Sequence, residues 1–234
     1  MSIGGKGKGG IEEASDNIFW TTMSDLMLGL AIIFMTLFIL AMTGFSQEKI
    51  KVEQQRVEAT KQLAEKLQNE KIDATVDNLT GSVKISDVEL FEVGSYNLSP
   101  KGKQFLNKFV PIYLNVLLEN PTVADNIENI IVQGHTDSQM FKGANTENEQ
   151  FSKNMFLSLQ RAYAVQDYMF KTNYNKNYDP ILRKILVVEG KSYAEPVLNA
   201  EGKEDLKESR RVELRLRVKG QSIGTMFGLN FNGN

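Results

Sequence analysis

The sequence predicts one membrane-spanning helix, a second helix directly after it, and a C-terminal α+β domain. Residues 18–45 are almost uninterruptedly apolar, residues 46–75 are rich in helix formers and lack glycine and proline, and residues 76–218 alternate between strand and helix patterns. Residues 1–17 and 219–234 are rich in glycine and polar side chains, so we expect both to be flexible tails.

The apolar segment 18–45 is long enough to cross a bilayer. A hydrocarbon core about 30 Å thick needs about 20 apolar residues in a helix, and Asp25 is the only ionisable residue in this segment. Phe19 and Trp20 lie at its start, where aromatic rings favour the membrane interface. A signal peptide is the alternative, but the apolar run is too long, no basic region adjoins it, and it contains a carboxylate. We therefore expect an uncleaved transmembrane helix.

The charges that flank this helix give a mild indication of its orientation. Lys6 and Lys8 precede it, whereas Lys49, Lys51 and Arg56 follow it. The positive-inside rule alone favours a cytoplasmic C-terminal domain. The family resemblance described below favours the opposite orientation, and a long domain can cross the membrane regardless of nearby charge.

The segment 46–75 is predicted to be a juxtamembrane helix with a weak heptad pattern. The apolar or small residues that define this pattern are Ile50, Val57 and Ala64, with Thr60 and Leu67 offset from them. A heptad this short and polar fits two interpretations equally well. The helix is either a solvated spacer or a segment that pairs with a second copy of the chain.

The domain at 76–218 is predicted to have the order β-α-β-α-β-β, an α+β sandwich with helices on one side of the sheet. The expected elements are a strand at 83–88, a helix that opens at Ser99 and Pro100, a strand at 129–132, a helix at 152–171, and strands at 185–188 and 210–218. A polar loop is expected from Ser138 to about Gln150.

The composition excludes several classes of chemistry. The chain has no cysteine and only one histidine, His135, so disulfides, thiol catalysis and multi-histidine or cysteine-bound metal sites are excluded within one chain. No serine is placed to form a triad with His135, and a net charge of −2 gives no field that would attract nucleic acid. We therefore expect neither an enzyme nor a resident cofactor or metal.

A series of short motifs in the C-terminal domain resembles the OmpA-like peptidoglycan-binding family over about residues 83–218. In order, these motifs are Gly134-His135-Thr136-Asp137, Asn154 with Leu157-Ser158, Arg161-Ala162, Gly190, Pro196 and Arg210-Arg211-Val212. The sequence departs from the family pattern in two places: the loop after Asp137 is longer than usual, and Ser209 stands where an asparagine often precedes the arginine pair. Arg210 and Arg211 either meet the wall polymer or close the sheet.

The resemblance implies that Asp137 and Arg161 bind diaminopimelate of the peptidoglycan stem peptide. This residue offers an ammonium and a carboxylate at one centre, which suit a carboxylate and a bidentate guanidinium respectively. Thr136, Asn154 and Leu157 are expected to shape the pocket. An internal salt bridge between Asp137 and Arg161 is the alternative, and a buried, hydrogen-bonded role is expected for the histidine of the motif.

The stretch from Trp20 to Met27, WTTMSDLM, resembles the B subunits of ion-driven stators of the MotB type. This short sequence is most similar to that of the MotB-like subunits of the Zorya anti-phage defence systems. The resemblance implies that Asp25 carries H⁺ or Na⁺. Hydrocarbon disfavours a charged carboxylate, so an aspartate in a membrane helix indicates a functional site. Thr21 and Thr22 share its helix face and are expected to help along the ion path. An aspartate that reaches from the helix end to the interface is the alternative.

The two resemblances together imply a particular assembly. We expect a homodimer of this chain inside a ring of polytopic MotA-like A subunits in the inner membrane, with a cytoplasmic N-terminus and a periplasmic domain on peptidoglycan. Cytoplasmic defence effectors would then act through the A subunit. The alternatives are a flagellar stator B subunit, a passive anchor between membrane and wall, and a periplasmic peptidoglycan enzyme. Asp25 argues against the passive anchor, and the absence of a placed nucleophile argues against the enzyme.

Overall fold

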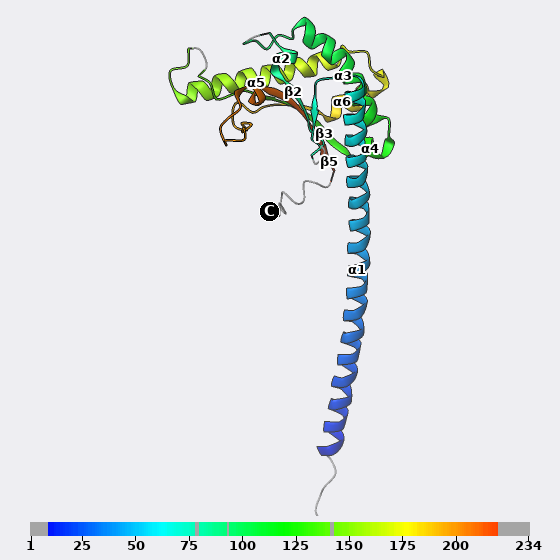
Figure 1. The fold of residues 1–234 in the computed structure, drawn as a ribbon. Helices are drawn as coiled ribbons and strands as arrows, with labels where there is room; N and C mark the ends of the chain where they lie inside the picture. Colours follow the sequence, from blue (N-terminus) through cyan, green and yellow to red (C-terminus); the bar gives the residue numbers. More distant parts are fainter. Residues whose placement is uncertain (1–8, 78–79, 93, 141–142, 220–234) are drawn as a thin grey trace, which may run out of the picture. The chain divides into compact units, whose positions relative to one another are not determined.

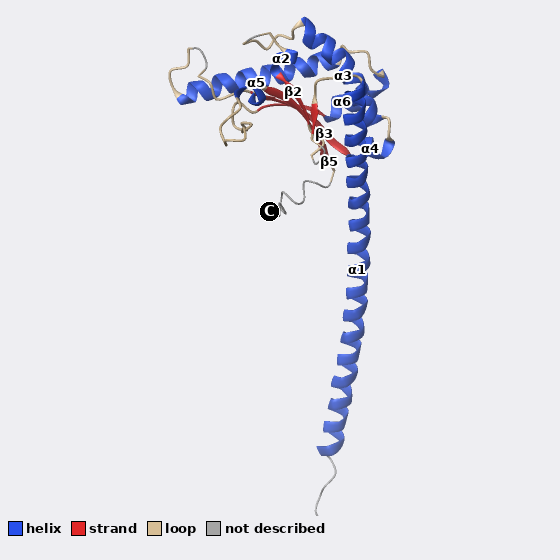
Figure 2. Cartoon of the chain, in the orientation of Figure 1, coloured by secondary structure: helices blue, strands red, loops and turns tan. Residues whose placement is uncertain are grey.

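The computed structural model describes residues 9–77, 80–92, 94–140 and 143–219 (Figure 1). Figure 2 shows helices and strands in separate colours. The helices are α1 (Gly9–Asn69), α2 (Asp87–Leu90), α3 (Pro100–Leu118), α4 (Pro121–Asn126), α5 (Glu147–Met169), α6 (Asp179–Ile185) and α7 (Leu206–Ser209), with a 3₁₀ turn at Lys176–Tyr178. The strands are β1 (Thr75–Val76), β2 (Val83–Ser86), β3 (Ile127–His135), β4 (Leu186–Gly190) and β5 (Arg211–Val218). Nearly all of the predicted C-terminal tail lies outside the described residues.

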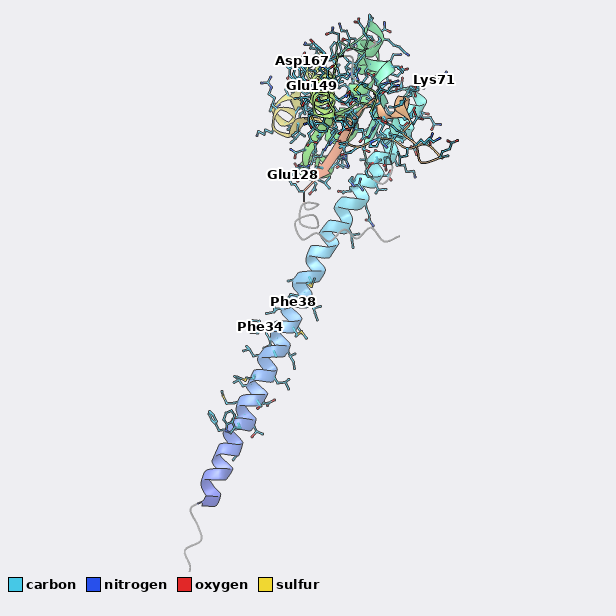
Figure 3. The ribbon with its side chains drawn as sticks, turned by 90° about the vertical axis from the view of Figure 1, so that its left-hand side faces the viewer. Phe34, Phe38, Lys71, Glu128, Glu149 and Asp167 are labelled. Atoms are coloured by element: carbon cyan, nitrogen blue, oxygen red, sulfur yellow. The ribbon has the colours of Figure 1, made fainter. Side chains whose placement is uncertain are left out.

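The first part of α1 contains the predicted membrane segment. The stretch Ile18–Met42, 25 residues, is long and apolar enough to cross a membrane. Phe34 and Phe38 project from this helix in Figure 3 and are 63% and 62% exposed, as expected for side chains whose solvent is lipid. The helix starts at Gly9, inside the region predicted to be a flexible tail. That prediction was wrong for residues 9–17, because extending a formed helix costs far less than nucleating one.

The last part of α1 belongs to the C-terminal domain. The chain divides into two compact units, Met1–Lys51 and Val52–Asn234, so the second unit starts well before the predicted boundary at residue 76. Ala59, Leu63 and Leu67 are buried in the hydrophobic core of this unit. Their spacing of four residues places them on one helical face, which the heptad pattern did not identify.

The core contact corrects part of the heptad interpretation. Of the residues in the predicted pattern, Thr60 and Leu67 are buried, whereas Ile50 and Val57 are 56% and 44% exposed. The interpretation of a fully solvated spacer is therefore wrong for the end of this helix, because one of its faces packs within its own domain.

The end of α1 is fixed by a Schellman-type turn. Lys71, labelled in Figure 3, has a φ of 53°, the left-handed conformation that ends many helices. Its N–H donates to the carbonyl of Gln68 at 3.1 Å, and the N–H of Ile72 donates to the carbonyl of Leu67 at 2.9 Å. Ile72 packs against the core beside this turn, so the helix ends where its apolar face meets the domain.

The domain contains one five-stranded sheet with the order β1-β2-β5-β3-β4. β3 and β4 are parallel, and the other neighbouring pairs are antiparallel. The predicted order β-α-β-α-β-β is confirmed by β2, α3, β3, α5, β4 and β5, with β1 and the short helices added. Apolar residues of these strands and of α3 and α5 form one core, with Phe109, Tyr113, Leu106, Ile130 and Leu214 among its most buried members.

Two glycines let α5 pack directly on the sheet. A Cβ at Gly134 would lie 1.9 Å from the carbonyl oxygen of Ser158, and one at Gly190 would lie 2.8 Å from its hydroxyl. The two glycines are register partners on β3 and β4. Glycine at both positions therefore brings the middle of α5 against the ends of these strands.

The start of α5 differs from the prediction. The helix begins at Glu147 rather than at 152, so the loop after Asp137 is shorter than expected. Thr146 is the N-cap, and its hydroxyl accepts a hydrogen bond from the N–H of Glu149. The Glu149 carboxylate in turn accepts from the N–H of Asn145. This Thr-x-x-Glu pattern is a helix-start signal that the polarity of the surrounding residues had hidden.

Candidate ligand-binding site

The ends of three neighbouring strands meet at one edge of the sheet. Arg211 is the register partner of Ser86 on one side and of His135 on the other. Because β5 is antiparallel to both neighbours, the carboxyl ends of β2 and β3 lie beside its amino end. The residues just beyond these ends, Asp87, Asp137 and Arg210, are therefore brought together although they lie far apart in the sequence.

The fourth charged residue comes from α5. The Arg161 guanidinium reaches the Asp87 carboxylate, with 3.2 Å between Nη2 and Oδ2. Its Nε donates to the carbonyl oxygen of Ser95 at 3.0 Å, and its Cζ lies 5.3 Å from the ring centroid of Phe91. These contacts orient the guanidinium from three sides, so the fold holds Arg161 in place before any ligand arrives.

Asp137 is paired with a different arginine. Its Oδ2 accepts from Nη1 of Arg210, and its Oδ1 accepts from the N–H of Gln139 at 3.3 Å. Nε of Arg210 also lies 4.0 Å from Oδ2 of Asp87. We call Asp87, Asp137, Arg161 and Arg210 the charge quartet; its two carboxylates and two guanidiniums have no net charge.

The quartet is mostly buried. The exposed fraction is 4% for the Arg161 side chain, 9% for Asp137, 13% for Asp87 and 32% for Arg210. Burial raises the pKa of Asp87, while the charges of Arg161 and Arg210 oppose that effect. Burial likewise lowers the pKa of Arg161, against the effect of Asp87. In such surroundings a charge without an opposite partner is costly, so each group needs one at all times.

The predicted site residues Asp137 and Arg161 thus lie in one cluster, but each forms its ion pair with another residue. The alternative of a salt bridge between the two is not what the structure shows, since Asp137 pairs with Arg210 and Arg161 with Asp87. Asp87 was missed because the sequence pattern placed it inside a strand. Acidic residues are common in this chain, and no local signal distinguished this one.

The predicted pocket-shaping residues lie next to Asp137 in sequence or on the helix that carries Arg161. Thr136 precedes Asp137, and its N–H donates to the carbonyl of Ser192 at 2.9 Å. Asn154 is buried, and its side-chain amide donates to the carbonyl of Gln150. Leu157 is half-buried on the same helix, one turn before Arg161.

The remaining residues of the motifs, the arginine pair and His135, differ in their burial and in their contacts. Arg211 is buried, its Nε donates to the Glu213 carboxylate at 2.6 Å, and its Nη1 donates to the carbonyl of Glu195. It lies at the start of β5, whereas Arg210 joins the quartet. His135 is 1% exposed as predicted, but neither ring nitrogen has a hydrogen-bond partner among the described residues, so the expected hydrogen bond is absent. Burial lowers the pKa of His135 to about 4, which keeps the ring neutral.

The membrane segment carries the remaining predicted site residues. Asp25 lies within the helical stretch Ile18–Met42, three residues after Thr22 and four after Thr21. The Thr22 hydroxyl donates to the carbonyls of Ile18 and Phe19, both at 2.9 Å. The Thr21 hydroxyl also donates to the Ile18 carbonyl, at 3.2 Å. Both hydroxyl groups thus donate to carbonyls of their own helix, one turn before Asp25.

The fold and the motifs define a class, and comparison with known sequences identifies it. The OmpA family profile matches residues 90–211, which include Asp137, Arg161 and Arg210. Over 211 residues the chain is 32% identical to the Zorya protein ZorB of Escherichia coli strain Crooks, with 86% of this chain and 88% of that protein covered. A second ZorB, from Escherichia coli O139:H28, is 23% identical over 89% of this chain and 83% of its own length. The chain therefore belongs to the OmpA family and, within it, groups with the ZorB proteins.

Among solved structures, the chain is similar to a MotB-like protein from Desulfovibrio vulgaris. The TM-score is 0.49 at 18% identity, over 72% of this chain and 96% of that one.

Proposed function

We propose that this protein is the wall-anchored B subunit of an ion-driven membrane motor that serves anti-phage defence. Membership of the ZorB group over most of the chain supports the assignment to this system. The observation that supports the anchoring function most directly is the charge quartet at the end of the sheet. In it Asp137 pairs with Arg210, and Arg161 pairs with Asp87. Diaminopimelate in the stem peptide of peptidoglycan is the ligand for which these charges are suited.

The ion-carrying function rests on Asp25. This residue is the only ionisable side chain between Ile18 and Phe45. Because a carboxylate in hydrocarbon is costly, its presence there indicates a function. In the proposed mechanism Asp25 takes up H⁺ or Na⁺ from one side, loses its charge, and releases the ion to the other side. Thr21 and Thr22 would line the path with oxygen atoms. A single helix cannot enclose such a path, so a ring of MotA-like A subunits would surround two copies of this chain.

The proposed orientation places the N-terminus in the cytoplasm and the domain in the periplasm, where peptidoglycan is found. The lysines that follow the membrane segment oppose this orientation only weakly, because a long domain crosses the membrane largely regardless of nearby charge. A topology reporter fused to the C-terminus should read as periplasmic. A cytoplasmic reading would contradict both the orientation and the wall-binding function.

Peptidoglycan binding by the domain tests the anchoring function. The fragment should begin at residue 52, because a fragment from residue 76 lacks the helix face that carries Leu63 and Leu67. Sedimentation with purified peptidoglycan should show binding by the wild-type fragment. Asp137→Ala or Arg161→Ala should weaken it about a hundredfold, since breaking a buried charge pair typically costs about 3 kcal/mol or more.

Two further variants complete that test. The double variant should bind little worse than either single one, because both residues grip one zwitterion. Lys171→Ala serves as the control, since the Lys171 side chain forms an exposed ion pair with Asp167 of α5. If both single variants bind like the wild type, the quartet is structural and the wall contact lies elsewhere.

A further inference from the structure

Asp87 has one carboxylate oxygen that the fold leaves unused. Its Oδ2 faces Arg161 at 3.2 Å and Arg210 at 4.0 Å. Its Oδ1 is buried and has no hydrogen-bond partner among the described residues. A buried carboxylate oxygen without a donor is costly, and few native groups remain in that state without a reason.

The surroundings of this oxygen indicate which ligand group would suit it. Arg161 and Arg210 already supply the positive charge that Asp87 needs in the free protein. The donor for Oδ1 must therefore come from outside the quartet. A ligand ammonium carries three N–H donors and a positive charge, so it can approach Asp87 and Asp137 together.

Charge balance explains how a zwitterion would enter. A ligand centre with one ammonium and one carboxylate adds one charge of each sign to a neutral quartet. The more exposed guanidinium of Arg210 can then turn towards the ligand carboxylate while Arg161 stays in place and the two aspartates take the ammonium. No buried charge loses an opposite partner during this exchange. The new ion pairs between the ligand and the quartet therefore offset the cost of removing the ligand charges from water. A ligand with the carboxylate alone would leave the two aspartates to compete with it for the arginines.

We propose that Asp87 is a specificity-determining residue of this site, which binds the ammonium of a zwitterionic ligand together with Asp137. The inference rests on the proposed peptidoglycan-binding function and adds the group that distinguishes a zwitterion from a simple carboxylate. In the free protein the same carboxylate holds Arg161 in position. Asp87 lies at the start of α2, where its own N–H donates to the carbonyl of Arg210 at 3.0 Å, so its place relative to the quartet is fixed by the backbone.

Two soluble ligands test this directly on the full-length protein in detergent. The first is a disaccharide tripeptide with meso-diaminopimelate, and the second carries 2-aminopimelate, which keeps the side-chain carboxylate but lacks the ammonium. Calorimetric titration should show that the wild type binds the first at least about tenfold more tightly, in line with the loss of a charged hydrogen-bonded pair. Asp87→Asn should bind the diaminopimelate ligand at least about tenfold more weakly, whereas its affinity for the aminopimelate ligand should fall by a much smaller factor, which reports the weaker positioning of Arg161.

The comparison between ligands separates recognition from a purely structural role. If Asp87 only positions Arg161, the variant should lose affinity for both ligands by the same factor, and that result would overturn the inference. Asp87→Glu retains the charge and should restore part of the preference for the ammonium. Glu89→Gln is the matched control, because it removes a carboxylate on the same short helix that pairs with Lys101 instead.

The outcomes for the proposed function and for this inference are distinct. If the wild type binds neither ligand, the peptidoglycan-binding function fails and the inference fails with it. If the wild type binds both ligands and Asp87→Asn keeps the wild-type preference, only the inference fails. Asp87→Ser repeats the measurement with a smaller neutral side chain if the asparagine variant proves unstable in thermal unfolding.

Discussion

Asp25 and Asp137 are both aspartates in surroundings that oppose a charge, but the two regions of the molecule treat them differently. In the domain, Asp137 is paired with Arg210, and two further charges complete a neutral cluster. In the membrane segment no basic residue lies between Ile18 and Phe45, so Asp25 has no counter-charge nearby in its own chain. A folded domain can neutralise its charges by bringing strand ends and helices together. A single helix cannot, and it must rely on other chains or on a bound ion.

The largest expected effect comes from Asp25→Asn, which tests whether the unpaired carboxylate carries function. Asparagine keeps the size and the hydrogen-bonding capacity but cannot ionise, so we expect complete loss of protection in a phage-challenge assay with normal membrane insertion. Thr36→Ala is a control within the same apolar stretch, since the Thr36 hydroxyl donates only to the carbonyl of Ile33 in the described structure. Full protection by Asp25→Asn would leave a passive anchor as the better description.

The boundary between the two regions can be tested by the stability of the domain. Leu63→Ala in a fragment from residue 52 should lower the free energy of unfolding by about 2–5 kcal/mol, because Leu63 is 2% exposed in the core. Val57→Ala is the matched control at an exposed position of the same helix and should cost about 0.5 kcal/mol or less. Denaturant unfolding measures both. Equal, small effects would mean that the domain folds without this part of α1.

The buried His135 predicts a pH dependence that belongs to the domain alone. Its pKa falls from 6.5 to about 4 through burial, so the unfolded chain takes up the proton first as the pH falls. The stability from the neutral ring is fully present above pH 6.5 and is lost as the pH falls to about 4. At about 1.4 kcal/mol per pKa unit, this amounts to about 3 kcal/mol.

His135→Gln isolates that contribution, because the acidic residues titrate in both proteins and their effects cancel. The difference in unfolding free energy between pH 7 and pH 4 should be about 3 kcal/mol larger for the wild-type fragment than for the variant. An identical pH dependence in both proteins would show that the imidazole titrates normally and is not desolvated.

The smallest effect concerns pairing between copies of α1. Val57 is exposed, whereas Gln55 is half-buried, so the face that carries Val57 remains available for a second copy. The chain contains no cysteine, and single cysteines can be introduced without interference. Val57→Cys should crosslink between subunits in membranes, and Gln55→Cys should do so poorly. Equal crosslinking at both positions would indicate that this helix separates the membrane from the wall without pairing.

Local patterns predicted most of the fold. The apolar run that contains Asp25, the N-cap at Ser99 and the alternation of Val212, Leu214 and Leu216 in β5 are each determined by residues close in sequence. The motif residues Asp137 and Arg161 could be named because the spacing of the whole series resembles one family. These features depend on short-range chemistry, and a sequence displays them directly.

Other features arose only from tertiary structure. The burial of Leu63 and Leu67 depends on a surface supplied by distant residues, so a weak heptad could not show which face would pack within the domain. Asp87 became part of the site because the antiparallel register of β2 and β5 sets it beside Arg210, and because α5 brings Arg161 across the sheet. A sequence records which charges a chain carries, but which charges become partners depends on strand register and helix packing over long separations.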